Sequence, residues 1–303
     1  MDLLAASIRI GTPLLLAALG GLLSERAGVF AVGLEGMMLA GAFAGLFGAC
    51  ATGSAAIGLL CAMLGGGLIG VMVAWVAVRC RADNMVTGLS ANIVALGATG
   101  MLLRLMSQAG GEAMHWVPLA AWTVPGLGRL PLLGPLFVQP PLTWLGLAGC
   151  IALTWFLRHS AIGLTLRATG ENPVAARAAG ADPRRVRERA VVAGAMIAGL
   201  GGAVLSLQQV GSFTEGMTGG RGYLALAALI VGRWTPFGAA LACLMFGGAE
   251  ALELHLEAAG AGLNPYLLQM TPYLAALAVL ALVGRSAQLP AAIGRPYSDG
   301  DVG

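Results

Sequence analysis

Few polar side chains lie inside the apolar stretches of this sequence, and those few could hydrogen-bond a polar solute. Asn84, Gly88 and Asn92 recur every fourth residue, so they share one face of a helix. Asn92, Gln208 and Gln209 carry amide groups, which suit a pocket with hydrophobic and aromatic walls. Hydrogen bonds between helices explain the same residues equally well, so both interpretations stay open.

Carboxylates in apolar stretches form the second group of candidates. Ionisable groups within a membrane are costly, and they face the bundle interior or a water-filled cavity. Glu35 could therefore contact a solute, or it could be structural, by pairing with Arg26 or capping a broken helix, which is the interpretation that we favour. Glu250 has the same two interpretations. The polar, glycine-rich run of residues 211–222 contains Glu215 and could form an outer gate or contact an external protein.

No arrangement of residues in the sequence predicts catalysis. The histidines His115, His159 and His255 are isolated from one another, and the five cysteines occur singly, without metal-ligand spacing. Neither a phosphate-binding loop nor a nucleophile elbow is present. We therefore expect no enzyme activity, no metal site and no cofactor in this chain, so that any energy source must come from a partner.

The composition places these candidates inside a membrane protein. The chain of 303 residues is 58% hydrophobic and 10% charged, with a mean hydropathy of +0.83, whereas soluble domains carry about 25% charged residues. A helix needs about 20 apolar residues to cross the hydrocarbon core. Charge-free windows reach that length at residues 36–78, with a turn near 51–54, and at 84–103, 130–157, 190–214 and 258–284.

These windows predict an all-α membrane protein, a polytopic bundle of eight to ten transmembrane helices, with the whole chain 1–303 as one domain. Small residues four apart, such as Gly41 with Gly45 and Gly66 with Gly70, mark helix contact faces. The glycine pairs of residues 29–38 favour a broken or re-entrant segment that lines a cavity.

Segments outside the windows are short. The stretch 104–141, rich in proline and tryptophan, is predicted to lie at the membrane interface. Residues 285–303 form a polar tail. A count of spans places the N-terminus outside, unless the segment around residues 24–51 is broken or re-entrant.

Charge is concentrated in residues 158–189, which hold seven of the seventeen basic residues. Arginine-rich loops of membrane proteins stay in the cytoplasm, so this segment and, by alternation of the spans, the C-terminus are expected there. Asn172 before a proline predicts the start of a helix, and Gly180 predicts its end. Asp182, also before a proline, predicts the start of a second helix. An ordinary amphipathic cytoplasmic loop would have the same features.

Three separated stretches resemble a known family. ATGENPVAARAAGADPRRVR (168–187) resembles the cytoplasmic coupling segment of ATP-binding-cassette (ABC) importer permeases. SERAGVFAVGLEGMMLAGA (24–42) resembles the N-terminal signature of bacterial nucleoside and simple-sugar permeases, and residues 211–252 resemble the same branch near its C-terminus. This branch belongs to the superfamily of ribose and branched-chain amino acid permeases. In one departure, members commonly carry asparagine where this chain has Ala31, so a polar group is missing from that turn.

The resemblance implies the membrane-spanning permease subunit of an ABC importer in the bacterial cytoplasmic (inner) membrane. It implies transport of nucleosides, or of related small polar solutes such as sugars, into the cytoplasm. Its implied partners are an ATPase subunit that holds ATP and Mg²⁺, a second and preferably non-identical permease, and an extracytoplasmic substrate-binding lipoprotein. Membrane lipid surrounds the chain, and nucleic acid is not an expected partner. The alternative is an ion-gradient-driven secondary transporter of small polar solutes, which would carry paired ion-coordinating residues and an inverted repeat.

Two sets of site residues follow. The resemblance places the ATPase coupling segment at about 159–189, and its expected contacts are Glu171, Asn172, Pro173, Ala175, Ala176, Gly180, Asp182, Arg184 and Arg185. The expected substrate path comprises Glu35, Asn92, Gln208, Gln209 and Glu215.

Overall fold

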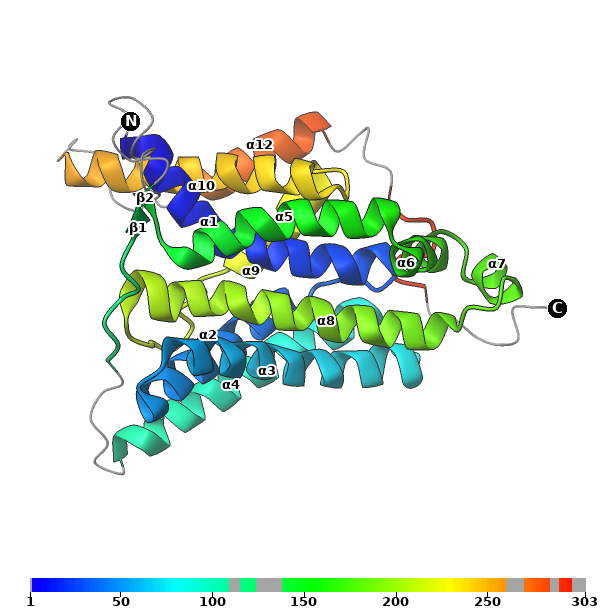
Figure 1. Ribbon diagram of the computed structural model, residues 1–303, viewed down its shortest axis with the longest axis horizontal. Coiled ribbons are helices and arrows are strands. Elements are labelled where there is room, and N and C mark those ends of the chain that lie inside the picture. The colour runs from blue at the N-terminus through cyan, green and yellow to red at the C-terminus, as the bar shows by residue number, and fades with distance from the viewer. Residues whose placement is uncertain (1, 109–114, 124–137, 260–269, 284–288, 296–303) are drawn as a thin grey trace.

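The computed structural model describes residues 2–108, 115–123, 138–259, 270–283 and 289–295. Its long helices run along one axis of an elongated bundle (Figure 1). Among the described residues, seven helices are long and apolar enough to cross a membrane. The predicted all-α, polytopic architecture is confirmed. These seven are fewer than the predicted eight to ten transmembrane helices, and the helices at Arg221–Val231 and Thr271–Val283 are shorter, with 11 and 13 residues.

The element bounds follow the apolar windows. The seven long helices are α1 (Asp2–Arg26), α2 (Leu34–Thr52), α3 (Ala55–Ala74), α4 (Asn84–Gln108), α5 (Pro141–His159), α8 (Pro183–Ala203) and α10 (Pro236–Ala258). The short helices are α6 (Ala161–Glu171), α7 (Pro173–Ala178), α9 (Arg221–Val231) and α12 (Thr271–Val283). π-Helical turns prolong α3 and α8 through Trp75–Arg79 and Val204–Val210. Two-residue strands, β1 (Trp122–Thr123) and β2 (Val138–Gln139), pair antiparallel.

Helices occupy three of the charge-free windows in different ways. The window 36–78 is two helices, with the chain turning at Gly53 in a left-handed conformation (φ 69°). In the window 130–157, helix α5 begins at Pro141, because a proline suits the first turn of a helix and not its interior. Residues 130–137 of this window lie outside the described residues. The window 258–284 is shared between the end of α10 and α12.

The predicted interfacial segment and tail are described only in part. Helix α4 extends into the interfacial segment as far as Gln108, and residues 115–121 are not helical. Residues 109–114 and 124–137 of that segment lie outside the described residues, as do 284–288 and 296–303 of the tail.

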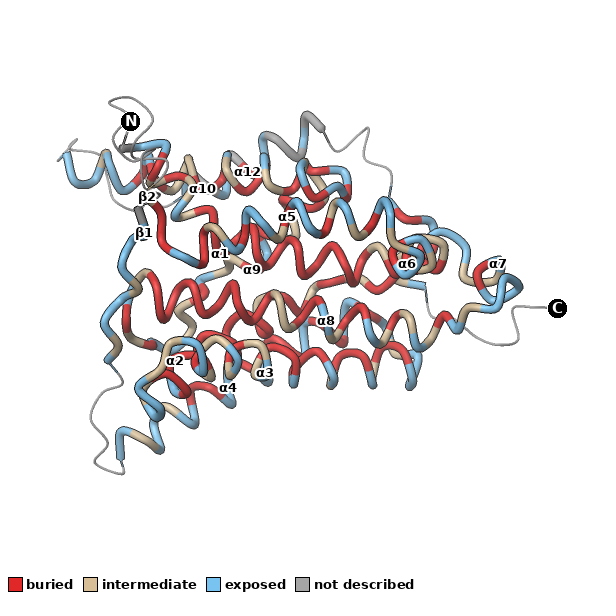
Figure 2. The backbone as a smooth tube through the Cα atoms, viewed as in Figure 1, coloured by how far each residue is buried: buried red, intermediate tan, exposed pale blue. Residues whose placement is uncertain are grey.

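Helices α1 and α8 form the centre of the bundle. Buried residues follow both of them along their length (Figure 2), and 67% and 78% of their apolar windows are buried, against 28% for α5. Gly199 of α8 faces Gly41 of α2 and Gly66 of α3, and a Cβ atom on any of the three would collide with the opposing backbone. These contacts confirm that small residues mark the helix contact faces.

The two ends of the bundle differ. Helix α7 and the C-terminal segment lie at one end, which we call the α7 end, and the N-terminus lies at the opposite end (Figure 1). Helix α1 runs to the α7 end, and the chain then leaves the helical conformation over residues 27–33 before α2 returns to the opposite end. We call this non-helical connection, residues 27–33, the broken segment; the helix that follows it, Leu34–Thr52, is continuous.

Candidate translocation and coupling sites

The first turns of α2 and α9 meet inside the bundle. Glu35, in the first turn of α2, accepts hydrogen bonds from the backbone N–H groups of Gly220 (2.8 Å) and Gly222 (2.6 Å) at the start of α9. A helix N-terminus has unpaired N–H groups and a positive dipole end, so it favours a carboxylate. Glu35 thus caps a helix, as the structural interpretation expected, but the helix is α9, and Arg26 instead contacts a backbone carbonyl elsewhere.

Asn92, on a third helix, forms hydrogen bonds to both sides of this junction. It is the ninth of the 25 residues of α4 and is 7% exposed. Its Oδ1 accepts the Gly36 N–H (2.8 Å), while its Nδ2 donates to the carbonyl of Val32 (3.0 Å) and to the hydroxyl of Tyr223 (3.0 Å). Both amide hydrogens therefore hold the broken segment and α9 in place.

A polar cluster of Arg221, Tyr223, Glu250 and Tyr273 lies beside this junction. Arg221 pairs with Glu250 of α10, and these side chains are 26% and 16% exposed. Tyr273 of α12 donates its hydroxyl to the carbonyl of Gly219 (2.9 Å). The residues Tyr223 and Tyr273 are 43% and 45% exposed. Because charged side chains in lipid are costly, this face must adjoin water or protein.

The other predicted path residues lie elsewhere. Gln208 is buried and contacts α5, where its Oε1 accepts the Leu142 N–H (3.2 Å). Gln209 donates to the carbonyl of Arg9 on α1 (3.2 Å). Glu215 forms an exposed ion pair with Arg104 near the far end of α4 (3.2 Å). Of the five predicted path residues, the structure brings Glu35 and Asn92 together at the junction and engages the others in separate contacts.

The aromatic residues of the cluster are not among the predicted path residues. Tyr223 and Tyr273 lie in apolar runs, where an aromatic residue looks like core. The signal that could have identified Tyr223 is its position directly after a glycine-rich, charged run. Among the described residues, no three His, Cys, Asp or Glu side chains gather as metal ligands do.

Hydrogen bonds between near neighbours in the chain begin both helices of the coupling segment. The Asn172 side chain accepts the Ala175 N–H (3.0 Å) and begins α7, and Gly180 follows the helix in a left-handed conformation (φ 89°). Asp182 accepts the N–H groups of Arg184 and Arg185 (3.1 and 3.3 Å) and begins α8. The predicted arrangement of helix, glycine and helix is present. Helix α7 projects from the end of the bundle (Figure 1).

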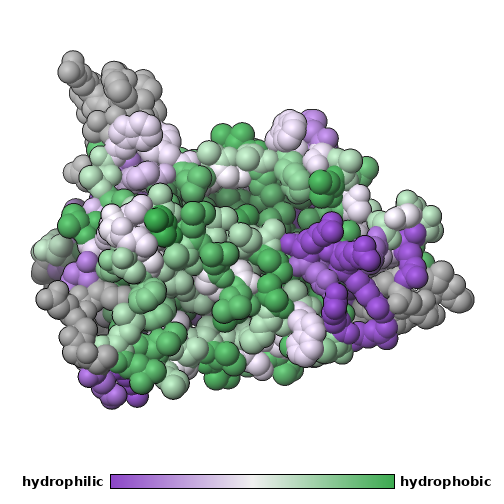
Figure 3. Space-filling view, turned by 60° about the horizontal axis from the view of Figure 1, so that its bottom comes forward, coloured by the Kyte–Doolittle hydropathy of each residue, from purple (hydrophilic) through white to green (hydrophobic). Residues whose placement is uncertain are grey.

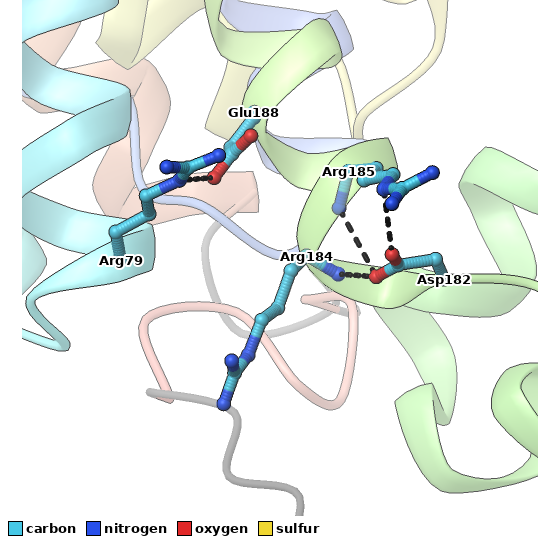
Figure 4. Close-up of polar contacts among 5 residues, drawn as sticks. All are labelled: Arg79, Asp182, Arg184, Arg185 and Glu188. Carbon is cyan, nitrogen blue, oxygen red and sulfur yellow. Dashed lines mark hydrogen bonds and ion pairs between the residues drawn. The ribbon is translucent and has the colours of Figure 1, made fainter.

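The coupling side chains have distinct surroundings (Figure 4). Arg185 folds back onto Asp182 (3.0 Å), whereas the Arg184 side chain points away from it. Glu171 accepts the N–H of Ala291 from the C-terminal segment (3.3 Å). Ala176 is the buried residue of α7, while Asn172, Ala175 and Gly180 are exposed and Pro173 is half-buried.

Beneath the coupling segment, Arg187 joins three parts of the chain. It lies in α8 and is only 3% exposed. Its Nε donates to the carbonyl of Ala27 (3.1 Å), its Nη1 to that of Arg295 (2.9 Å) and its Nη2 to that of Ala292 (3.4 Å). One guanidinium therefore links α8 to the broken segment 27–33 and to the C-terminal segment 289–295.

The broken segment is also fastened to the turn between α9 and α10. Glu25 is fully buried, and its carboxylate accepts hydrogen bonds from the Trp234 indole and from the Ala31 N–H (3.3 Å). Arg26 donates from Nε and Nη2 to the Trp234 carbonyl (2.9 and 2.7 Å). Trp234 and Arg233 both have positive φ angles (52° and 53°), which these contacts hold in place.

Comparison with known proteins shows the family of this chain. Residues 3–283 match the family described as the branched-chain amino acid transport system permease component. The chain is 38% identical to the guanosine ABC transporter permease protein NupQ of Bacillus subtilis, with 97% of this chain and 96% of the relative covered. It is 33% identical to the nucleoside ABC transporter permease protein NupC of Lactococcus lactis (98% and 97%) and 31% identical to a putative glucose ABC transporter permease protein, TsgC13, of Haloferax volcanii (92% and 90%). No solved structure matches significantly. The chain belongs to the branched-chain amino acid transport system permease family, and it is a non-catalytic, membrane-spanning permease of an ABC transporter.

Proposed function

We propose that this permease imports nucleosides and that the polar face at the α2–α9 junction lines their path. The observation that carries the proposal is the pair of exposed tyrosines, Tyr223 and Tyr273, beside charges that already pair with each other. Aromatic faces suit the base of a nucleoside, and hydroxyl and backbone groups suit its sugar. Relatives named as guanosine and nucleoside permeases support the same substrate class.

The α7 end is the cytoplasmic end in this proposal, and the C-terminus is cytoplasmic too. The arginines of residues 158–189 support this orientation, because positive charge is retained on the cytoplasmic side. An ATPase subunit, which supplies ATP and Mg²⁺, contacts α7 and the start of α8 through the predicted coupling residues. A second, non-identical permease faces the polar cluster and completes the path. A substrate-binding lipoprotein delivers the solute at the opposite end.

The coupling route runs from α8 through Arg187 into the broken segment. Motion of α7 and α8 acts on the carbonyl of Ala27, and residues 27–33 lead directly to Glu35. Because Asn92 and Glu35 hold the first turns of α2 and α9, a shift of the broken segment alters the junction where the solute passes.

Uptake of radiolabelled guanosine tests the substrate proposal. The complete transporter is expressed in a strain that lacks nucleoside uptake, and unlabelled nucleosides, ribose and glucose are added as competitors. We expect Tyr223→Leu and Tyr273→Leu to raise the half-saturating guanosine concentration by up to about tenfold, because an aromatic pair contributes about 0.5–1.5 kcal/mol beyond its burial. Trp155→Leu, an exposed aromatic residue of α5, is the matched control and should change nothing.

Two results would overturn the substrate proposal. Competition by glucose but not by nucleosides would assign the permease to sugars. Equal effects of the tyrosine variants and of Trp155→Leu would remove the junction from the path.

A further inference from the structure

Two apolar grooves flank α8 on the outside of the bundle. The first, about 620 Å³, lies between α8 and the α5–α6 hairpin, and its walls include Phe156 and Ile197. The second, about 480 Å³, lies between α8 and the end of α3, and its walls include Val71 and Trp75. Both grooves are open to the exterior. The first is lined by apolar side chains apart from Thr165 and Arg189, and the second combines apolar walls with the charged residues Arg79, Glu188 and Arg189.

Arg189 and Ala193 of α8 line both grooves. They are four residues apart, so they lie on the same face of the helix, and both are exposed. Because Ala193 projects only a methyl group, the ridge that separates the grooves is low directly beside Arg189. A molecule with two apolar chains can therefore lie across α8 with one chain in each groove.

The grooves meet positive charge at the α7 end. Arg79 lines the second groove, where its Nε donates to Glu188 (2.8 Å) while its side chain stays 66% exposed (Figure 4). Within the part of the chain that the structure describes, no ion pair engages Arg189. The two arginines, Arg79 and Arg189, and the single carboxylate of Glu188 give the lining of the second groove a net charge of +1 (2 − 1). Figure 3 shows hydrophilic side chains gathered at one end of a largely hydrophobic face.

We propose that an anionic diacyl phospholipid binds astride α8, with its phosphate at Arg189 and one acyl chain in each groove. Basic residues at the mouth of a cleft between transmembrane helices recognise anionic headgroups. Trp75 is 59% exposed in the second groove, and an aromatic ring at the level of the headgroups is typical of the membrane interface. A single-chain amphiphile would fill only one of the two grooves. A zwitterionic headgroup carries a positive group of its own, which the positive charge of Arg79 and Arg189 repels.

The bound lipid joins α3, α5 and α6 to α8 close to the coupling segment. Its chains contact α5 and α6 on one side and α3 on the other, while the Arg79–Glu188 ion pair links α3 to α8 directly. Helix α8 begins at Pro183, only six residues before Arg189 (189 − 183). The lipid therefore holds the part of α8 that follows α7.

Lipid retention by the purified full transporter tests the proposal. The complex is stripped with detergent, incubated with palmitoyl-oleoyl phosphatidylglycerol or the matching phosphatidylcholine, and separated by size exclusion. Mass spectrometry then counts the bound lipids. Arg189→Gln removes the headgroup contact and Ala193→Phe raises the ridge between the grooves. Arg158→Gln removes an exposed arginine at the end of α5 that lines neither groove, so it is the matched control.

We expect the wild type to retain phosphatidylglycerol in preference to phosphatidylcholine. Arg189→Gln should weaken phosphatidylglycerol retention about tenfold, as expected for the loss of one charge-assisted contact. Ala193→Phe should reduce retention of both lipids, and Arg158→Gln should match the wild type. Equal retention of the two lipids by the wild type, or equal retention by Arg189→Gln and Arg158→Gln, would overturn the proposal. If one groove variant fails to assemble, the other decides.

Discussion

Glu35 and Gly222 are in direct contact, although 187 residues separate them in the chain. The carboxylate accepts the Gly222 N–H at 2.6 Å, and a Cβ atom on Gly222 would lie within van der Waals overlap of the Glu35 backbone. The first turns of α2 and α9 are therefore held together by the Glu35 hydrogen bond, and they approach this closely because Gly222 has no side chain. Any motion that separates the first turns of α2 and α9 must first break this contact.

Gly222→Ala should destabilise the permease. The new methyl group forces α9 away from Glu35 and weakens the cap, and we expect a loss of about 1–3 kcal/mol, as is usual for overpacking. The thermal unfolding midpoint of the purified protein measures it. Gly97→Ala is the control, because Gly97 lies in α4 with open space around it, and alanine there should be neutral or stabilising by about 0.5–1 kcal/mol. Similar midpoints for the two variants would contradict the locked junction.

Asn92→Leu and Asn92→Asp should both lower the unfolding midpoint. Leucine leaves the Gly36 N–H and the Val32 carbonyl without partners, and we expect each lost contact to cost about 1–3 kcal/mol. Aspartate restores the acceptor but places an oxygen against the Val32 carbonyl. A variant that keeps full stability and only raises the half-saturating solute concentration would instead make Asn92 a substrate contact.

Gly180→Leu should uncouple ATP hydrolysis from transport. A non-glycine residue in the left-handed conformation costs about 1–2 kcal/mol, which displaces α7 from the start of α8. We expect the assembled transporter to lose solute-stimulated ATPase activity. Gly53→Leu imposes the same strain at the opposite end of the bundle, with open space around it, and should keep that stimulation. Loss of stimulation in both variants would point to general destabilisation.

Arg187→Gln should reduce transport per ATP hydrolysed. Glutamine cannot reach Ala27 and the C-terminal segment at once, so the link between α8 and the broken segment is lost. Arg187→Lys keeps the charge but lacks the three separate nitrogen donors of the guanidinium. It should restore only part of the transport per ATP hydrolysed. Reconstituted vesicles allow solute uptake and phosphate release to be measured together. An unchanged ratio in Arg187→Gln would show that Arg187 has a purely structural role.

Local signals made the coupling segment predictable. Asn172 and Asp182 cap the helices that follow them, because a cap depends on neighbours two or three residues away. Apolar length likewise predicted the long helices, since each span must satisfy the same membrane thickness. The non-helical residues before α2 lie beside Gly33, Gly36 and the lone carboxylate of Glu35, which are visible in the sequence.

Contacts between distant segments could not be predicted from periodicity. The structural interpretation of Glu35 was a pair with Arg26, nine residues away, or the cap of a broken helix, and the structure places Glu35 against the first turn of α9. Nothing in the local sequence relates Arg221 to Glu250 or Tyr273 to Gly219, because those contacts depend on how α9, α10 and α12 pack. The tyrosines of the cluster were overlooked for the same reason.

The three carbonyls that surround Arg187 also fix an order of events during biosynthesis. Ala27 is made first and Arg187 much later, but two of the three acceptors belong to residues 292–295. Until the ribosome has delivered those residues, the buried guanidinium is only partly compensated, and the end of the bundle that carries α7 stays unfinished. Assembly of this end of the bundle is thereby tied to synthesis of residues 292–295, which follow all seven long helices in the chain.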